Sequence, residues 1–555
     1  MKKPELKDLT LREKIAQTLL VRQCDLLLHA ENDYKTFREP REAAEIMEKN
    51  QFGGIWGHGN IDVTAMTGSL AGTVNFTAES HKAWIDEMKS KVKYPIICAC
   101  DSCGGVGYTG LGRTLQGLIM GAANDEELSY QLGYNQAREH ALAGINWIWS
   151  PVVDRTSPRS AHIFRSAAGY NDILINQSRA FIKGIQDAGI AACAKHFPGS
   201  DGLDDRDSHI VASKIRASFD EWQEIQGNVF QEMIDAGVYT IMTAATAFPA
   251  VDPRKKNGRY YPASLSKPII TGLLKEKMGF KGVVISDDVT MGGYTSFYSR
   301  EDVYVELLAA GQDVLLGVGI DALDIVEKAV NEGRLTEERI DDACQRVLDL
   351  KEKLGLFNEK EKTFDYTAEE AVNISKKTFK AVAEKGITLL RDKANLIPVS
   401  KDDIKKVTII TYSHSDITSP LEVMKKAFEE RGAEVVLRDK LETFNDAKKV
   451  AEESDLIVYA GYIGPHAPKG MPSFYGDVFW SLRYAFIEGN EKSVGVSLGY
   501  PFIHYHFMDD SLCFFNLYRT NPEVMEAFVA AMYGEIEPKG ISPLDLSIIC
   551  GNDEE

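Results

Sequence analysis

Cysteine is scarce in this sequence, and no disulfide framework can be read from it. The eight cysteines are spread over 555 residues, and several lie inside apolar runs, where a free thiol behaves as a small hydrophobic side chain. We therefore expect a reduced, cytoplasmic compartment. Three of them form the pattern Cys98-x-Cys100-x-x-Cys103, which could bind a metal, but no second cluster supplies further ligands. We expect these three thiols to be packing groups of a strand and not metal ligands.

Long hydrophobic runs and an excess of positive charge are also absent. No stretch approaches the roughly 18 consecutive apolar residues of a membrane helix. Charges recur every few residues in the N-terminal MKKPELKDLTLREKIAQTLLV, which lacks the apolar core of a signal peptide. Lysine and arginine number 63 against 82 aspartates and glutamates, a net charge of −19. Such a surface repels phosphate backbones and anionic lipids, so we expect neither nucleic acid nor membranes as partners.

What is present is the composition of a folded enzyme. With 44% hydrophobic and 26% charged residues, the chain has the apolar material to build a core that a disordered chain lacks. Its 555 residues exceed the roughly 100–200 residues of one ordinary domain. We therefore expect two or three domains.

Apolar runs alternate with amphipathic, helix-like stretches through the first part of the chain. Continuous apolar runs suit parallel strands that are covered on both faces. Eight strands, each followed by a helix, predict a (β/α)8 barrel of the TIM type with insertions, and a doubly wound open sheet is the alternative. The eight runs are TLLVR (18–22), FGGIWG (52–57), PIICACD (95–101), INWIWSPVVD (145–154), GIAACAKHF (189–197), YTIMTA (239–244), GVVISDD (282–288) and DVLLG (313–317).

A second strand–helix series follows a charged connector. Five further runs with helices between them predict a smaller three-layer α/β sandwich domain. We therefore place the barrel in residues 1–360, the connector in 361–385 and the sandwich domain in 386–555. The five runs are VTIITYS (407–413), AEVVLRD (433–439), DLIVYAGY (455–462), SVGVSLG (493–499) and SLCFFNLY (511–518).

Polar residues end several of the predicted barrel strands. Because a barrel's active site forms at the C-terminal ends of its strands, charged residues gathered there indicate a polar substrate pocket. Each aspartate alone could instead be the N-cap of a following helix. The set includes a lysine and a histidine, and it favours a site. Its members are Asp101, Asp154, Lys195, His196, Asp287 and Asp288.

The segment CAKHFPGSDGLDDRDSH (193–209) is the most informative stretch. A predicted strand runs into a turn at Pro198 and Gly199, and a polar loop then carries Asp207-Ser208-His209. Aspartate and histidine two residues apart can hydrogen-bond, so that the carboxylate orients the imidazole and stabilises its charged form. Four aspartates in this loop could instead suggest a calcium site, but the alternating spacing of an EF-hand is absent. We expect no metal.

Several motifs occur in a fixed order along the chain. KHFPG is followed by D-S-H, and SLSKPIITGLLKEKM is followed by GFKGVVISDDVTMGG (279–293). Supporting pieces are GINWIWSPVVD (144–154), RSAAG (165–169) and D-S-C-G-G (101–105). Together they resemble glycoside hydrolase family 3, in its β-N-acetylglucosaminidase (β-hexosaminidase) branch. EKGITLLRDKANLIPV (384–399) and VSLGYP (496–501) resemble that family's α/β sandwich domain, so the resemblance spans nearly the whole chain.

The resemblance implies roles for seven residues. Asp287 would be the nucleophile that forms a glycosyl–enzyme intermediate, and His209, paired with Asp207, would be the acid/base. A histidine, with an ordinary pKa of ~6.5, can donate and then accept a proton near neutrality. No metal or organic cofactor is implied. The residues that would bind sugar hydroxyls are Asp101, Arg165, Lys195 and His196.

The sequence also departs from the family pattern. Ala245 follows Met-Thr-Ala, where the family usually has histidine, and the 193–209 loop is one residue longer than usual. In DSCGGVGYT, Cys103 replaces a glutamate, and Val106 and Thr109 stand at or near two arginine positions. These changes remove polar contacts to the substrate but neither the nucleophile nor the acid/base pair. The reaction class is therefore better determined than the identity of the sugar.

We expect a retaining exo-acting β-N-acetylhexosaminidase that releases terminal β-linked GlcNAc from small carbohydrates such as cell-wall or chitin fragments. The alternatives are a β-glucosidase or β-xylosidase of the same superfamily, an N-acetylglucosaminide phosphorylase and a non-catalytic sugar-binding relative. We expect hydrolysis to dominate, with phosphorolysis as a side reaction. Whether the chain forms a homo-oligomer stays open.

Overall fold

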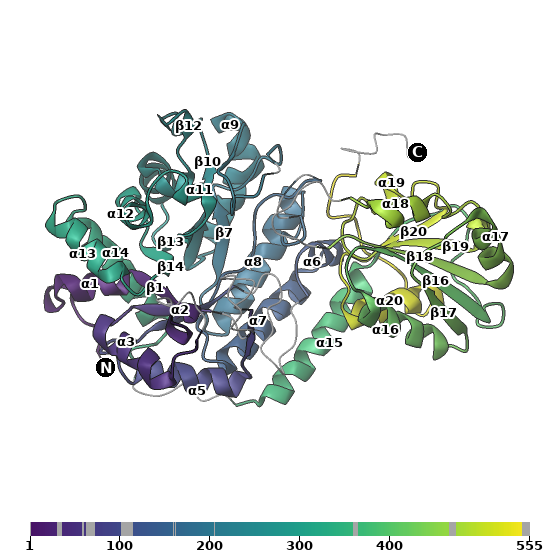
Figure 1. Cartoon of the computed structure of the whole chain (residues 1–555), viewed down its shortest axis with the longest axis horizontal. Coiled ribbons are helices and arrows are strands. Elements are labelled where there is room, and N and C mark those ends of the chain that lie inside the picture. The colour runs from purple at the N-terminus through teal and green to yellow at the C-terminus, as the bar shows by residue number, and fades with distance from the viewer. Residues whose placement is uncertain are drawn as a thin grey trace. The chain divides into compact units, whose positions relative to one another are not determined.

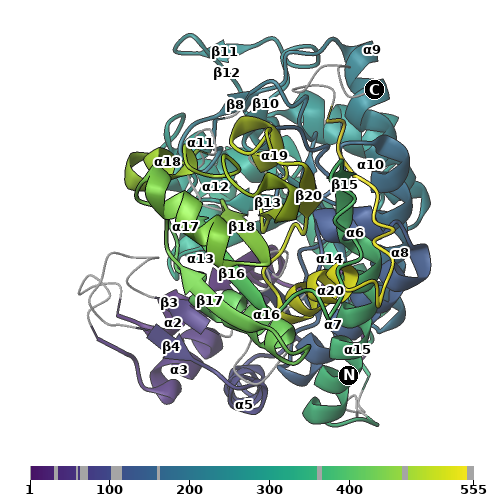
Figure 2. The same cartoon turned by 90° about the vertical axis from the view of Figure 1, so that its right-hand side faces the viewer.

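The computed structural model (Figures 1 and 2) describes residues 2–29, 36–57, 60–62, 73–101, 115–158, 160, 163–204, 206–358, 365–464 and 473–546. The chain divides into two compact units. Unit 1 comprises Met1–Thr114, Ser129–Arg155 and Ser178–Ser375, and unit 2 comprises Leu115–Leu128, Thr156–Gln177 and Lys376–Glu555. Two stretches from the first half of the chain thus belong to unit 2. The domain boundaries at residues 360 and 385 stay predictions.

Unit 1 is built on an eight-stranded parallel sheet whose neighbours follow the order β6-β5-β2-β1-β14-β13-β9-β7. The two end strands, β6 and β7, are joined by parallel bridges between Trp147 and Ala191 and between Val152 and Lys195. The sheet thereby closes, which confirms the predicted (β/α)8 barrel over the open sheet. The strands are β1 (Leu19–Arg22), β2 (Gly54–Trp56), β5 (Ile97–Cys100), β6 (Trp147–Ile148), β7 (Cys193–Phe197), β9 (Thr240–Thr243), β13 (Val283–Asp288) and β14 (Val314–Val318).

The barrel strands form because their residues are apolar on both faces, as parallel strands with two covered faces require. Side chains from all eight strands belong to one buried cluster that includes Leu20, Trp56, Trp147, Ile285 and Leu316. The helices that surround them in Figure 1 supply the outer cover.

The helices of unit 1 follow the strands in the alternating order that the sequence predicted. Side-chain caps mark several of their starts: the Thr10 side chain accepts the Glu13 N–H at the first helix, and Ser299 accepts the Asp302 N–H. The helices lying within unit 1 are α1 (Leu11–Gln17), α2 (Gln23–Leu27), α3 (Pro40–Asn50), α5 (Ala78–Lys89), α9 (Phe219–Trp222), α10 (Asn228–Asp235), α11 (Gly292–Thr295), α12 (Arg300–Ala310), α13 (Ala322–Asn331) and α14 (Glu337–Lys353). Unit 1 also contains the π-helical segments η3 (Gln223–Gly227) and η5 (Pro268–Lys277) and the 3-10 segments η1 (Leu6–Asp8) and η4 (Ala263–Leu265).

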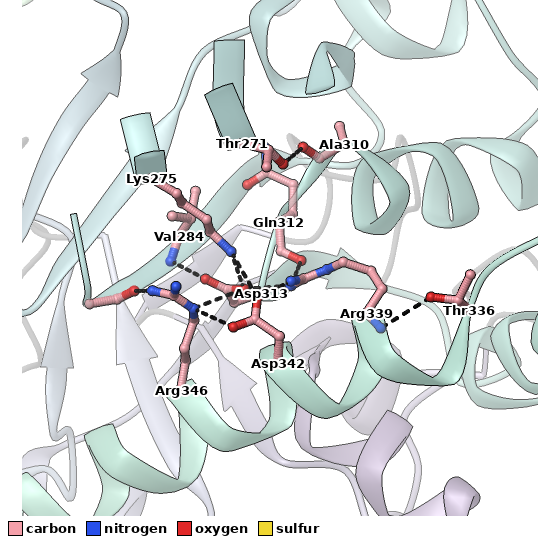
Figure 3. A network of polar contacts seen from close by, with 11 residues as sticks. Thr271, Lys275, Val284, Ala310, Gln312, Asp313, Thr336, Arg339, Asp342 and Arg346 are labelled. Atoms are coloured by element: carbon pink, nitrogen blue, oxygen red, sulfur yellow. Dashed lines mark hydrogen bonds and ion pairs between the residues drawn. The ribbon is translucent and has the colours of Figure 1, made fainter. Parts of the chain in front are cut away.

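A charged network holds the N-terminal ends of β13 and β14 (Figure 3). Asp313, fully buried just before β14, accepts hydrogen bonds from Lys275 Nζ at 2.6 Å, Arg339 Nη2 at 2.5 Å and the Val284 N–H at 2.9 Å. Asp342 pairs with the same two cations and with Arg346. Because a buried carboxylate is costly unless it is paired, the network ties η5, both strands and α14 together at the barrel end opposite Asp287.

Unit 2 contains a six-stranded sheet with the order β15-β20-β19-β18-β16-β17. All neighbours are parallel except β15 and β20. The five predicted strands are present, and the antiparallel edge strand β15 was not predicted. The strands are β15 (Thr388–Asp392), β16 (Lys406–Ser413), β17 (Glu434–Arg438), β18 (Leu456–Tyr462), β19 (Ser493–Ser497) and β20 (Cys513–Asn516).

Helices cover both faces of this sheet, as the predicted three-layer domain requires. α16 and α20 pack against each other on one face, with Phe428 and Phe528 edge to face, and α18 and α19 lie over the other (Figure 1). The helices within unit 2 are α6 (Leu118–Ala123), α16 (Thr418–Glu429), α17 (Phe444–Glu453), α18 (Gly476–Leu482), α19 (Ile503–His506) and α20 (Pro522–Met532). α7 (Glu126–Leu142), α8 (Asn171–Asp187) and α15 (Ala368–Gly386) contribute residues to both units.

Three short ladders lie in loops of unit 1. They are β3 (Asn60–Asp62) with β4 (Thr73–Asn75), β8 (Ser213–Lys214) with β10 (Thr246–Ala247), and β11 (Lys255–Lys256) with β12 (Arg259–Tyr260). The β8–β10 pair fixes the chain that returns from the Asp207–His209 region. Over the described residues, no helix is both long and apolar enough to cross a bilayer.

Candidate active site

Charged residues from three strands meet at one face of the barrel. Asp101 directly follows β5, Lys195 and His196 lie in β7, and Asp287 lies near the end of β13. Because the barrel strands are parallel, their C-terminal ends share a face. The structure thus places at one rim of unit 1 these four of the six residues that the sequence analysis assigned to strand ends.

Lys195 and Asp101 link two of these strands. The Lys195 ammonium donates a hydrogen bond of 3.1 Å to Asp101 Oδ1. The lysine side chain is 1% exposed, whereas the aspartate side chain is 33% exposed. A buried ammonium needs a carboxylate partner, and the partner here faces solvent, where it can also meet a substrate.

His196 is held by a residue that the sequence did not pair with it. Its ring Nδ1 lies 2.7 Å from Asp154 Oδ2, and its backbone N–H donates to both Asp154 carboxylate oxygens at 3.2 and 3.3 Å. Both side chains are buried. Asp154 therefore fixes the orientation of the His196 ring, and the only sequence signal for it was its place at the end of a predicted strand.

Asp207 and His209 form a hydrogen-bonded pair on the loop after β7. Asp207 Oδ1 lies 2.6 Å from His209 Nδ1 and also accepts the His209 backbone N–H at 2.9 Å. The carboxylate side chain is 7% exposed and the imidazole 53% exposed. Since the carboxylate engages Nδ1, the other ring nitrogen is the one that can exchange a proton with a bound molecule.

Asp287 is electrostatically coupled to both His209 and Lys195. Burial raises the pKa of Asp287, and the positive charges of His209 and Lys195, with a 2.8 Å hydrogen bond from the Asp288 N–H, oppose that rise. A carboxylate and a cationic imidazole near each other stabilise each other's charged forms. The pair is therefore suited to a reaction that needs an anion and a proton donor together.

The neighbouring Asp288 has a different environment. Its Oδ1 accepts hydrogen bonds from the Thr290 N–H at 2.8 Å and from Arg22 Nη2 at 3.3 Å, at the end of β1. These bonds close the turn after β13. Of the two adjacent aspartates, Asp288 thus shapes the loop, and Asp287 is the one that interacts with His209.

A buried tyrosine beside Asp287 has no signal in the sequence. Tyr294 is fully buried, and its hydroxyl hydrogen-bonds Ser264 at 2.8 Å. Burial and then the negative charge of Asp287 raise the pKa of Tyr294 well above its ordinary value. The phenol therefore stays protonated.

The remaining residues named in the sequence analysis are not assigned to this rim by the structure. Arg165 lies in a half-buried turn of unit 2, and its assignment to the pocket stays a prediction. Ala245 is fully buried between β9 and β10. Cys103, Val106 and Thr109 lie outside the described residues. No group of three or more His, Cys, Asp or Glu side chains in the described ranges could hold a metal ion.

The chain shares its sequence features with characterised proteins. A beta-N-acetylglucosaminidase/beta-glucosidase of Cellulomonas fimi is 26% identical over 509 residues, which cover 86% of this chain and 87% of that protein. A beta-hexosaminidase of Hydrogenovibrio crunogenus is 30% identical over 191 residues, which cover 34% of this chain and 51% of that protein. The chain thus spans most of the first relative and about half of the second.

Solved structures share the fold over nearly the whole chain. A beta-glucoside phosphorylase, BglX, superposes with a TM-score of 0.81 at 23% identity, covering 97% of this chain and 94% of that one. A glycoside hydrolase family 3 beta-N-acetylglucosaminidase from Paenibacillus sp. str. FPU-7 gives a TM-score of 0.79 at 24% identity, with coverages of 97% and 99%. The sequence model of the Glycosyl hydrolase family 3 N terminal domain matches residues 10–350, more than half of the chain. The chain therefore belongs to glycosyl hydrolase family 3.

Proposed function

We propose that this chain is a retaining glycoside hydrolase that removes terminal β-linked N-acetylhexosamine, with GlcNAc as the expected sugar. Asp287 is the nucleophile, and His209, oriented by Asp207, is the acid/base. The relatives named beta-hexosaminidase and beta-N-acetylglucosaminidase support the substrate class. The observation that carries the proposal is geometric: Asp207 Oδ1 lies 2.6 Å from His209 Nδ1, and the His209 carbonyl accepts the N–H of Gly292, five residues after Asp287.

The reaction follows from these positions. In the first step Asp287 attacks the anomeric carbon while His209 protonates the glycosidic oxygen, so the aglycone leaves and a glycosyl ester forms on Asp287. In the second step His209, now neutral, removes a proton from water as the water attacks the same carbon. Asp287 leaves as a carboxylate, and the sugar is released with its original configuration. Asp207 stabilises the imidazolium at each stage where it forms.

Three of the rim residues have the chemistry to bind sugar hydroxyls. Asp101 presents a partly exposed carboxylate, and Lys195 supplies a buried positive charge between Asp101 and Asp287. His196 is fixed by Asp154 and offers its second ring nitrogen. We assign these residues, together with Arg165, to binding of the terminal sugar.

Replacing the nucleophile tests the assignment. Asp287→Ala leaves no carboxylate to attack the anomeric carbon, so turnover of an aryl β-N-acetylglucosaminide should fall by at least about a thousandfold. Asp288→Ala is the matched control, because it removes the adjacent carboxylate and should weaken the turn but retain measurable turnover. Turnover of Asp287→Ala at the wild-type rate would eliminate the proposal.

A β-glucosidase or β-xylosidase of the same family is the second candidate. The name of the Cellulomonas fimi relative, which joins both activities, favours testing it. The departures from the family pattern at Ala245, Cys103 and Thr109 leave the choice of sugar open. We expect aryl N-acetylglucosaminide to be preferred over aryl glucoside and aryl xyloside in kcat/KM. A wide preference for glucoside or xyloside would replace our substrate assignment.

The acceptor can also differ from water. After donating its proton a histidine is neutral, so it does not repel a phosphate dianion as a carboxylate would. Phosphate can then attack the glycosyl–Asp287 ester and give a sugar 1-phosphate. The negative charges of Asp201, Asp204 and Asp205, close to His209 in the sequence, oppose this, so we expect hydrolysis to dominate. Product analysis at millimolar phosphate decides, and an active enzyme that forms no sugar 1-phosphate at any phosphate concentration would exclude the side reaction.

A non-catalytic sugar-binding relative is the alternative from a different class. The departures from the family pattern are consistent with a protein that has lost catalysis. The chain nevertheless keeps Asp287 and a hydrogen-bonded Asp207/His209 pair. Formation of a covalent adduct with a fluorinated sugar would exclude it. For the compartment we keep the expectation of a reduced, cytoplasmic location.

A further inference from the structure

The loop that carries His209 is not anchored by its own apolar side chains. We define the His209 loop as residues 199–212, between β7 and β8. Its large apolar side chains Leu203, Ile210 and Val211 are 57%, 55% and 38% exposed. Burial of apolar area therefore contributes little to its position, and its conformation depends on polar and backbone contacts.

Two aspartates hold the start and the end of this loop together. Asp201 accepts the N–H groups of Leu203, Arg216 and Ala217. Asp204 accepts the N–H of Lys214 at 2.8 Å. These hydrogen bonds connect the two ends of the loop, but none of them involves His209.

Residues 208–210 of the His209 loop contact two glycines, Gly292 and Gly293, which follow strand β13. The Gly292 N–H donates to the His209 carbonyl at 2.8 Å. A Cβ on Gly292 would lie 2.2 Å from the Ile210 carbonyl oxygen. A Cβ on Gly293 would lie 2.6 Å from the Ala245 Cβ and 3.1 Å from the Ser208 carbonyl oxygen. Backbone thus packs directly on backbone, at a separation that leaves no room for a side chain.

We propose that Gly292 and Gly293 are positioning residues. Their close contacts with the His209 loop hold His209 where its side chain can act on the same substrate as Asp287. Asp287 lies in β13, and Gly292 begins α11 five residues later, so one short segment of chain joins the nucleophile to the contact with His209. The inference rests on the proposed function, because it assumes that His209 acts on the substrate of Asp287. It also gives Ala245 a role, since only a small side chain there lets Gly293 approach Ser208.

The first test adds one methyl group at the contact. Gly292→Ala should displace His209 without removing any catalytic side chain or the amide donor. Gly272→Ala in η5 is the matched control, because a Cβ there meets no atom within 4 Å. Amide hydrogen exchange should become faster in peptides covering residues 206–212 and 288–296 of Gly292→Ala and stay unchanged in Gly272→Ala.

The second readout separates lost acid catalysis from general damage. A series of aryl N-acetyl-β-glucosaminides, from phenyl to 2,4-dinitrophenyl, needs progressively less protonation of the leaving oxygen. In Gly292→Ala, kcat/KM should fall about tenfold to a thousandfold for the phenyl glycoside, as expected for a lost general acid, and by little for the dinitrophenyl glycoside. A fall by one common factor across the series would overturn the proposal.

A compensating pair makes the test independent of one variant's folding. Gly293→Ala should show the same dependence on the leaving group, because its methyl group collides with that of Ala245. Adding Ala245→Gly removes the opposing methyl group and should restore at least about half of the lost kcat/KM on the phenyl glycoside. Absence of any rescue, with both proteins folded, would contradict the assigned contact.

The two readouts distinguish the two claims. If the wild type cleaves none of the aryl N-acetylglucosaminides, the proposed function fails, while hydrogen exchange still decides whether the glycines hold the loop. Unchanged exchange in Gly292→Ala overturns the loop contact whatever the activity. Faster exchange with an unaltered leaving-group series overturns the positioning role.

Discussion

At the residue scale, Asp207 makes two separate hydrogen bonds to His209. Its Oδ1 engages both the ring and the backbone N–H of the histidine, so the same oxygen sets the orientation of the imidazole and the geometry of the turn. The Asp207 side chain is almost fully buried and the imidazole half exposed, which keeps the pair rigid on the protein side and open on the substrate side.

Asp207→Asn should therefore lower activity while keeping the fold. The amide has no charge to stabilise the imidazolium, so kcat/KM on the phenyl glycoside should fall about tenfold to a thousandfold. Asp220→Asn, on the exposed face of α9, is the control and should match the wild type. Kinetics of purified proteins with equal melting temperatures check this; an Asp207→Asn enzyme as active as the control would remove Asp207 from the mechanism.

Lys195 is one of the groups, after His209 and the Asp288 N–H, that oppose the rise in the pKa of Asp287. Burial raises the pKa of Asp287, and the Lys195 charge counters it. Because Asp287 must be ionised to attack, kcat/KM should decline as pH falls through this pKa. Removing the cation in Lys195→Gln raises the pKa further, so the acidic limb should move to higher pH, whereas in Lys267→Gln, an exposed control, it should not. A pH–rate profile measures the limb, and a shift to lower pH would refute the coupling.

At the element scale, the junction between β9 and β10 supports the loop that carries His209. β10 pairs with β8 at the exit of that loop, with Ser213 and Thr246 hydroxyls 2.7 Å apart, and Ala245 lies immediately before it. A residue that departs from the family pattern thus lies at a packing contact between two loops.

Restoring the family's histidine at position 245 should damage this junction. Ala245 is fully buried against Gly293, so an imidazole in Ala245→His cannot be accommodated without backbone shifts, at a cost of about 1–3 kcal/mol in the free energy of unfolding. We expect lower activity on the phenyl glycoside. Chemical denaturation and kinetics test this, and a more active variant of unchanged stability would show that the position has room for the family contact.

The barrel strands could be predicted because buried strands appear in the sequence as short apolar segments. Parallel barrel strands are covered on both faces and therefore read as continuous apolar runs. The edge strand β15 was missed because Leu389 to Asp392 are only half buried, which leaves no such run. The proposed nucleophile and the proposed Asp207/His209 pair were named from motifs whose residues are close together in the chain.

Contacts between distant backbone segments were not predictable. Asp154 and His196 are 42 residues apart, and no spacing rule joins them. The hydrogen bond between the Gly292 N–H and the His209 carbonyl joins two backbone groups. Nearly every residue has these groups, so the sequence does not indicate which of them pair. The Asp313 network in Figure 3 likewise joins residues whose pairing depends on closure of the barrel.

At the scale of the whole molecule, that network makes the stability of unit 1 depend on pH. Burial alone would raise the pKa of Asp342, but the charges of Lys275, Arg339 and Arg346 outweigh it and lower the pKa to about 2. A carboxyl whose pKa is lower in the folded than in the unfolded state contributes stability above the unfolded value, near ~3.9. That contribution is lost as pH falls from about 4 to about 2.

Asp342→Asn should remove this part of the pH dependence. The variant should be less stable than the wild type at neutral pH, and the difference should shrink as pH falls below about 4. Glu338→Gln, exposed on the same helix, is the control and should track the wild type. Urea unfolding at several pH values measures the difference, and a gap that widens toward low pH would reverse the assignment.

The central claim is that catalysis passes through a covalent sugar ester on Asp287. In a 5-fluoro N-acetyl-β-glucosaminyl fluoride, the ring fluorine slows both steps and the fluoride leaving group offsets this in the first, so the ester accumulates. Intact-protein mass spectrometry should show the mass of one fluorinated sugar added, and peptide mapping should locate it on Asp287. An active wild-type enzyme that forms no adduct, or forms it on another residue, would contradict the account.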